Sequence, residues 1–199
     1  MPGAIQYDAS DRASLVEVDC PGLHEEIFDG AEESLLRVRL HEFEGELELA
    51  ALAGIRRSLL NLEGHGLRMQ DTVDGPSLAL RPLEPRSVSS QTAQDWDARI
   101  SGAATLLELQ FEGDQDSLEI IALRLGERSL RESLRPGYAY LLAHAGSLRA
   151  RVTDEEDPFE LEPGESLWLQ ELEGEEELEI IGTSKDLVVV LAQLRSDRR

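Results

Sequence analysis

Apolar and polar residues alternate at period two in many short segments of the chain. The clearest run joins three aliphatic and three basic residues: Leu36, Arg37, Val38, Arg39, Leu40 and His41. The same alternation occurs in residues 46–49, 118–125, 138–144, 148–152, 166–169 and 187–194. Alternation of this kind places one set of side chains in a core and the other toward solvent or a cavity. We therefore predict a β-strand in each of these segments.

Turn signals separate these predicted strands. Glycine, alone or next to proline, recurs about every 8 to 12 residues, which is the spacing of short strands in an all-β sandwich or barrel. The signals include Gly45, Gly64, Gly113, Gly146 and the pair Pro163-Gly164. Only residues 29–36 and 87–96 are compatible with a turn or two of helix. The pattern predicts an all-β chain with little helix.

The chain also contains a weak internal repeat. Residues 59–68 resemble residues 140–149, because in each copy an apolar strand meets a glycine turn and the next strand begins with Leu-Arg. A proline-containing turn and a final apolar strand follow each copy. The hydrophilic stretch 112–117 lies between the copies. Two copies of one β-barrel module explain this pattern, and we predict modules at 1–112, including an N-terminal arm, and 113–199.

Charge restricts the partners of this protein. The 199 residues include 41 acidic and 19 basic side chains, for a formal net charge of −22. Such a field repels phosphate backbones and anionic lipid headgroups, so we expect neither nucleic acid nor a membrane as partner. Cys20 is the single cysteine, which leaves no intrachain disulfide. With no signal-peptide pattern and no apolar run long enough to span a bilayer, we expect a cytoplasmic protein.

Five motifs follow one another along the chain. They are Leu36-Arg37-Val38-Arg39-Leu40, Gly54-Ile55-Arg56-Arg57-Ser58-Leu59, Leu62-Glu63-Gly64-His65-Gly66-Leu67, Ala98-Arg99-Ile100-Ser101-Gly102-Ala103 and Leu161-Glu162-Pro163-Gly164-Glu165-Ser166-Leu167. In this order they resemble the HutD/Ves family over roughly residues 25–194. The resemblance implies a bicupin, which is two small antiparallel, jelly-roll-like β-barrels in one chain. It also implies a bacterial protein without established catalytic activity, with a regulatory role in histidine utilisation and N-formylglutamate or urocanate as ligand.

Several polar positions of the family differ in this chain. The family's Trp-Lys-Asn-Gly-Gly-Gly signature is missing, and its Phe-Pro-Gly is Leu52-Ala53-Gly54. The aspartate that precedes the family's arginine is Arg56, and an asparagine of the family is Glu108. These differences change polar groups of the family's pocket, so the resemblance implies the fold more directly than it implies the ligand.

Metal and nucleophile signatures are missing from the sequence. The four histidines, His24, His41, His65 and His144, are never within ten residues of one another. No strand therefore carries the His-x-His pair of a cupin metal site. The chain also has no Gly-x-Ser-x-Gly elbow, and Cys20 precedes Pro-Gly with no base beside it. We predict no metal, no cofactor and no catalytic residue.

Basic side chains at strand positions are the candidate ligand-binding residues. Arg37, Arg39 and His41 share one strand face, from which a guanidinium could bind a carboxylate through two hydrogen bonds. The alternation does not decide whether this face is the outer surface or the barrel lumen. Arg57 matches the arginine of the family and is a candidate on the same grounds. Glu108 could orient such an arginine or face water.

The hypothesis that follows is a non-catalytic protein whose N-terminal barrel binds a small anionic metabolite through Arg37 and Arg57. Two alternatives stay open. One is a metal-independent cupin enzyme, an isomerase or lyase, that acts through His41 or His65 and a carboxylate. The other is a structural bicupin that has lost its ligand pocket. A homodimer formed through edge strands is compatible with each of them.

Overall fold

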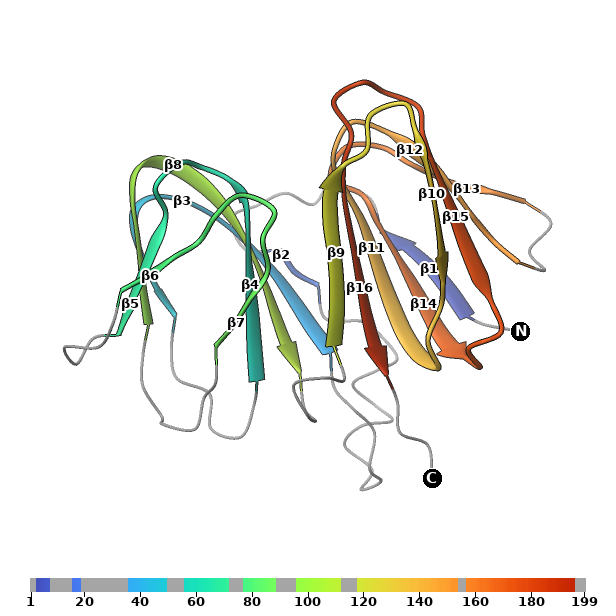
Figure 1. Ribbon diagram of the computed structural model, residues 1–199, viewed down its shortest axis with the longest axis horizontal. Coiled ribbons are helices and arrows are strands. Elements are labelled where there is room, and N and C mark those ends of the chain that lie inside the picture. Colours follow the sequence, from blue (N-terminus) through green and yellow to red (C-terminus); the bar gives the residue numbers. More distant parts are fainter. Residues whose placement is uncertain are drawn as a thin grey trace. The chain divides into compact units, whose positions relative to one another are not determined.

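The computed structural model describes eight stretches of the chain: 3–7, 16–18, 36–49, 56–71, 77–88, 96–111, 118–153 and 157–195. Within these residues the regular elements are all β-strands, and none is a helix (Figure 1). The described residues of the two segments considered for helix, namely Leu36, Ser87, Val88 and Trp96, lie in strands. The prediction of an all-β chain is confirmed.

The chain divides into two compact units. One unit is Arg12–Gln115, and the other is Met1–Asp11 together with Asp116–Arg199. The expected seam at 112–117 lies outside the described residues. Strand β1 (Gly3–Tyr7) belongs to the second unit, because it pairs antiparallel with β14 (Ser166–Leu172).

The N-terminal unit, Arg12–Gln115, is built on one antiparallel sheet. Its strands are, in spatial order, β2 (Val16–Val18), β3 (Leu36–Leu49), β8 (Trp96–Phe111), β4 (Arg56–Glu63) and β7 (Arg86–Val88), with β5 (Arg68–Asp71) and β6 (Leu78–Ala79) beside the first part of β8. A register shift between β3 and β8 lies beside Gly102, whose φ is 114°. Such an irregularity bends the paired strands, and β3 and β8 curve together in Figure 1.

One face of this curved sheet holds a small apolar core. The core contains Leu49, Leu59, Leu67, Met69, Leu80, Val88, Ile100, Ala104 and Leu106. On β3 the glutamates that alternate with these inward positions, Glu42, Glu44, Glu46 and Glu48, are exposed. The alternation predicted for residues 46–49 is therefore present, with leucine inward and glutamate outward.

The Leu62–Leu67 motif contains the turn that joins β4 to β5, which pair with successive parts of β8. Gly64 and Gly66 have φ values of 119° and 77°, in the region that favours glycine. A Cβ atom on Gly64 would also lie 2.7 Å from the Cδ1 atom of Ile100. Asn61 is fully buried, and its Nδ2 group donates to the carbonyl oxygens of Gly64 at 3.0 Å and Leu80 at 3.1 Å. The motif thus closes one end of the apolar core.

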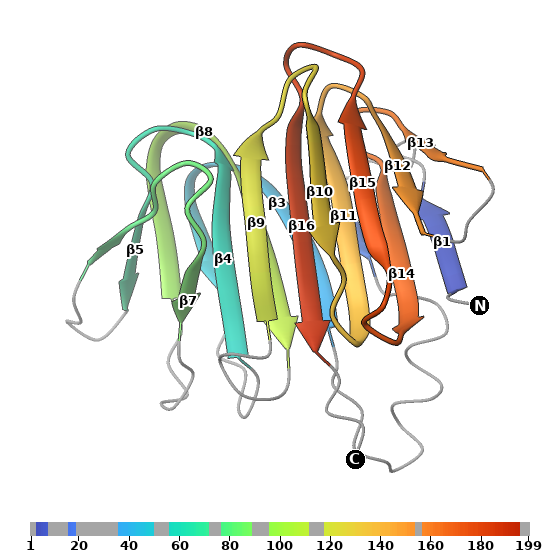
Figure 2. The same ribbon diagram turned by 45° about the vertical axis from the view of Figure 1, so that its right-hand side comes forward.

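The C-terminal unit has two antiparallel sheets that face each other (Figure 2). One sheet is β1, β14, β11 (Gly137–Ala145), β16 (Val188–Arg195) and β9 (Leu118–Arg124), and the other is β10 (Ser129–Ser133), β15 (Glu177–Gly182), β12 (Leu148–Val152) and β13 (Phe159–Leu161). A cluster of buried leucine, isoleucine, valine and alanine side chains fills the space between them. The strands predicted from alternation in this half of the chain are confirmed, as is the prediction of two antiparallel β modules.

Candidate functional site

Arg39 and His41 of β3 lie on the same side of the N-terminal sheet as its apolar core. Leu59 and Leu106 belong to the apolar core on that side, and Glu108 follows Leu106 by two positions, so it points the same way. In the register of the sheet, Arg39 and Leu59 flank Glu108 from β3 and β4. His41 is opposite Leu106 in the same register. The structure therefore settles a question that alternation left open: these side chains face inward.

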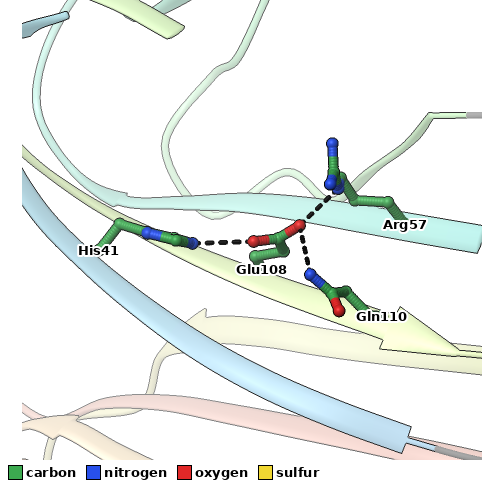
Figure 3. A network of polar contacts seen from close by, with 4 residues as sticks. All are labelled: His41, Arg57, Glu108 and Gln110. Atoms are coloured by element: carbon green, nitrogen blue, oxygen red, sulfur yellow. Dashed lines mark hydrogen bonds and ion pairs between the residues drawn. The ribbon is translucent and has the colours of Figure 1, made fainter. Parts of the chain in front are cut away.

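Four polar side chains form one network on this face (Figure 3). The Nε2 atom of His41 lies 2.8 Å from Oε2 of Glu108. Gln110 donates from its Nε2 atom to Oε1 of Glu108 at 2.9 Å, and Nε of Arg57 forms an ion pair with the same oxygen. Strands β3, β4 and β8 each contribute to the network, and Glu108 is at its centre.

The network is buried. His41 and Arg57 are 8% and 7% exposed, and Glu108 and Gln110 are each 1% exposed. A carboxylate can remain charged in such a place only when it is paired and hydrogen-bonded. Glu108 meets that condition, because both of its oxygens have partners.

These contacts also determine the protonation of Glu108. Burial acts to raise the pKa of this carboxyl group, but the hydrogen bond with His41, the charge of Arg57 and the hydrogen bond from Gln110 outweigh it and hold the pKa below its ordinary value. Glu108 is therefore ionised at neutral pH and can only accept hydrogen bonds. It follows that His41 and Gln110 are the donors in their bonds to Glu108.

The structure brings together three of the five candidates, His41, Arg57 and Glu108. Arg39 is partly buried and lies opposite Glu108 in the register. Arg37 lies opposite Gln110, but its side chain is outside the described part of the chain. His65, the other histidine considered for catalysis, is exposed in the turn after β4.

Sequence reasoning did not identify Gln110 as part of the site. The available signal was the segment Leu106–Phe111, in which two polar residues two positions apart interrupt an apolar strand. Residues at that spacing share one face of a strand. A buried polar pair on the inward face of a strand needs partners on its neighbours, and Gln110 could have been found by that argument.

The inner face of the C-terminal unit differs from this site. Its described core is aliphatic across both sheets.

Among the described residues of the whole chain, no group of three or more His, Cys, Asp and Glu side chains is placed to hold a metal ion. No helix in the described residues is long and apolar enough to cross a membrane.

Comparison with known proteins relates this fold to several solved structures. No protein-family model and no curated protein sequence matches the chain. A conserved protein of unknown function from Pseudomonas aeruginosa aligns with a TM-score of 0.67 and 18% identity over 81% of this chain and 82% of its own. YhaK from Escherichia coli aligns with a TM-score of 0.63 and 15% identity over 81% of this chain and 86% of its own.

HutD from Pseudomonas fluorescens is also among these structures. It aligns with a TM-score of 0.59 and 13% identity, over 97% of this chain and 100% of its own. At such identities the likeness establishes the fold. The fold that the HutD/Ves resemblance implied, two antiparallel β modules in one chain, is therefore confirmed.

Proposed function

We propose that the N-terminal unit binds a small anionic metabolite at the network of His41, Arg57, Glu108 and Gln110, in a regulatory role without catalysis. The observation that carries this proposal is the burial of four polar side chains, two of them ionised, on the face that also holds the apolar core residues Leu59 and Leu106. Desolvation costs several kcal/mol per ion, and a well-packed aliphatic cluster of similar volume is often at least as stable. A role in recognition accounts for such a network better than stability does.

Arg57 is the group that would recognise the anion. Its planar guanidinium has five N–H donors in a fork that matches a carboxylate. Glu108 contacts this group at Nε, so the terminal nitrogens are held in one orientation. Pre-orientation of a charged donor lowers the entropy lost when a ligand binds.

The ligand implied by the resemblance to the HutD/Ves family is N-formylglutamate or urocanate. Both are carboxylates and therefore suit a forked guanidinium donor. The aliphatic core beside the network, which includes Leu59 and Leu106, would contact the carbon skeleton of such an acid. This combination of an apolar wall and a few polar groups is typical of small-molecule sites.

A thermal-shift screen of the full chain tests the proposal. The acids are N-formylglutamate, urocanate and glutamate, and the variants are Arg57→Lys and, as a matched control, Arg131→Lys on the exposed face of the C-terminal unit. A ligand at about 100 times its Kd adds roughly 2.7 kcal/mol of stability, a shift of several degrees at this size. We expect Arg57→Lys to lose this shift and Arg131→Lys to keep it. A wild-type protein that shifts with none of the acids would contradict the proposal.

One observation favours a second candidate function, that of a metal-independent enzyme. The His41–Glu108 pair has the geometry in which a carboxylate orients an imidazole for general acid–base catalysis. Such a pair could move a proton between two positions of a bound acid. The test is exchange of carbon-bound hydrogen for deuterium in D₂O, followed by proton NMR with a catalytic amount of protein. Exchange that requires His41 would support an isomerase or lyase, and no exchange would leave binding as the function.

A further inference from the structure

Two acceptor-capable atoms of the network, Oε1 of Gln110 and Nδ1 of His41, are buried without a hydrogen-bond partner among the described residues. The side chain of His41 as a whole is 8% exposed. A buried polar atom without a partner costs free energy that a ligand can recover by supplying one. The question is which kind of ligand group Nδ1 would bind.

The chemistry of Glu108 answers that question. Its carboxylate is ionised and can only accept, so the proton of His41 lies on Nε2, the atom 2.8 Å from Glu108. The charge of Glu108 is opposed by Arg57. In a neutral imidazole that donates from Nε2, the Nδ1 atom carries a lone pair and is an acceptor. A ligand group that pairs with Nδ1 must therefore be a hydrogen-bond donor.

We infer that His41 is a specificity-determining contact of the ligand site, and that the ligand carries an O–H or N–H donor for Nδ1 in addition to its anionic group. The inference rests on the proposed function and narrows it to hydroxy acids, amino acids and N-acylated amino acids. An acid without such a donor would leave the lone pair unpaired. A second carboxylate placed at Nδ1 would repel it. Sites built around a buried hydrogen bond reject analogues that lack the group.

The first experiment needs no ligand. Long-range ¹H–¹⁵N NMR of the histidine rings in the full ¹⁵N-labelled chain reports which ring nitrogen is protonated, and His41→Gln assigns the signal. We expect a proton on Nε2 and a bare Nδ1 at neutral pH. A proton on Nδ1, in either the other tautomer or the imidazolium, would overturn the inference and would leave the proposed function standing.

The second experiment measures the discrimination directly. Calorimetry compares N-acetylglutamate with its N-methyl derivative, and 2-hydroxyglutarate with 2-methoxyglutarate, so that each pair differs in one donor. We expect the acid with the donor to bind about tenfold more tightly. Equal affinities within both pairs would overturn the inference alone. If none of these acids binds and the thermal-shift screen is also flat, the proposed function fails together with the inference.

The variant His41→Gln provides a further control on the same pairs. The glutamine amide nitrogen can take the position of Nε2 and donate to Glu108, while nothing replaces Nδ1. We expect this variant to bind the two members of each pair with equal affinity. If His41→Gln still bound the two acids of a pair with different affinities, another residue would be the one that accepts from the ligand's donor group. That result would overturn the role of His41.

Discussion

Replacing Glu108 by glutamine tests whether the buried network depends on charge. The change keeps the shape of the side chain and removes its negative charge. The ion pair with Arg57 is then lost, and a guanidinium that is 7% exposed stays in the core without its carboxylate. The new amide nitrogen would also oppose the Nε2–H of His41 or the donors of Gln110.

The magnitude follows from these contacts. Removing one partner of a buried ion pair costs about 3–5 kcal/mol, since the other charge is left uncompensated. One amide oxygen remains and still accepts, and His41 can relieve the clash by moving its proton to Nδ1. We therefore expect a loss near the lower end, about 3 kcal/mol, in the free energy of unfolding. With a typical urea slope of about 1–3 kcal/mol per molar, the midpoint falls by at least about 1 M.

The assay is urea unfolding followed by circular dichroism, with Glu46→Gln as the matched control. Glu46 forms an ion pair of ordinary length with Arg99 in the same sheet, at 2.8 Å, but both side chains are more than half exposed. An exposed pair contributes about 0–1 kcal/mol, so the control should be nearly neutral. If Glu108→Gln lost no more stability than Glu46→Gln, the argument for a charged, buried network would be refuted.

Three further predictions concern stability and use the same urea assay. Because the pKa of Glu108 is lower in the folded chain than in the unfolded one, its ionised form adds stability above pH 4.5, the ordinary value, and this stability is lost as pH falls through the folded pKa. The difference in unfolding free energy between wild type and Glu108→Gln should therefore shrink on acidification. A difference that stays constant with pH would contradict the lowered pKa of Glu108. Asn61→Leu removes both donors of a buried side chain and should cost at least about 2 kcal/mol, whereas a neutral result would mean that the two carbonyl groups do not need it. Gly146→Ala should lower the free energy of unfolding several times more than Gly66→Ala. Both positions have positive φ, but a Cβ atom on Gly146 would lie 2.1 Å from Oγ of Ser184, while one on Gly66 would meet nothing within 4 Å. Equal losses of stability would show that φ alone determines the cost, about 1 kcal/mol.

Part of the strand pattern could be predicted from local sequence, because one buried face imposes period two on a strand. Alternation identified β3 and five strands of the C-terminal unit, β9, β11, β12, β14 and β16, but it did not identify β1, β10, β13 and β15. The direction of that face could not be predicted. It depends on strand pairing, which sets Arg39 opposite Glu108 and brings His41 into contact with the same carboxylate. Pairing of strands that are far apart in the sequence leaves no local signal.

In the candidate site, too, individual residues could be identified from the sequence, but the contacts between them could not. Arg57 was found through a motif, and Glu108 was found through its position in the closing strand. Their contact depends on the register between β4 and β8, in which Arg57 lies opposite Gln110. That register is a property of the folded sheet, and for the same reason the role of Gln110 became visible only in the structure.

The pairing of β1 with β14 has a consequence for the way the chain is made. The segment Gly3–Tyr7 is synthesised before Arg12–Gln115, but its partner Ser166–Leu172 is synthesised only after the whole of that range. Until β14 has been synthesised, Gly3–Tyr7 has no β14 with which to form the backbone hydrogen bonds of the sheet. A fragment that begins at Asp116 would lack this strand and would expose the backbone edge of β14, which is a template for pairing with other chains. The C-terminal unit therefore cannot be completed until the whole N-terminal unit has been synthesised.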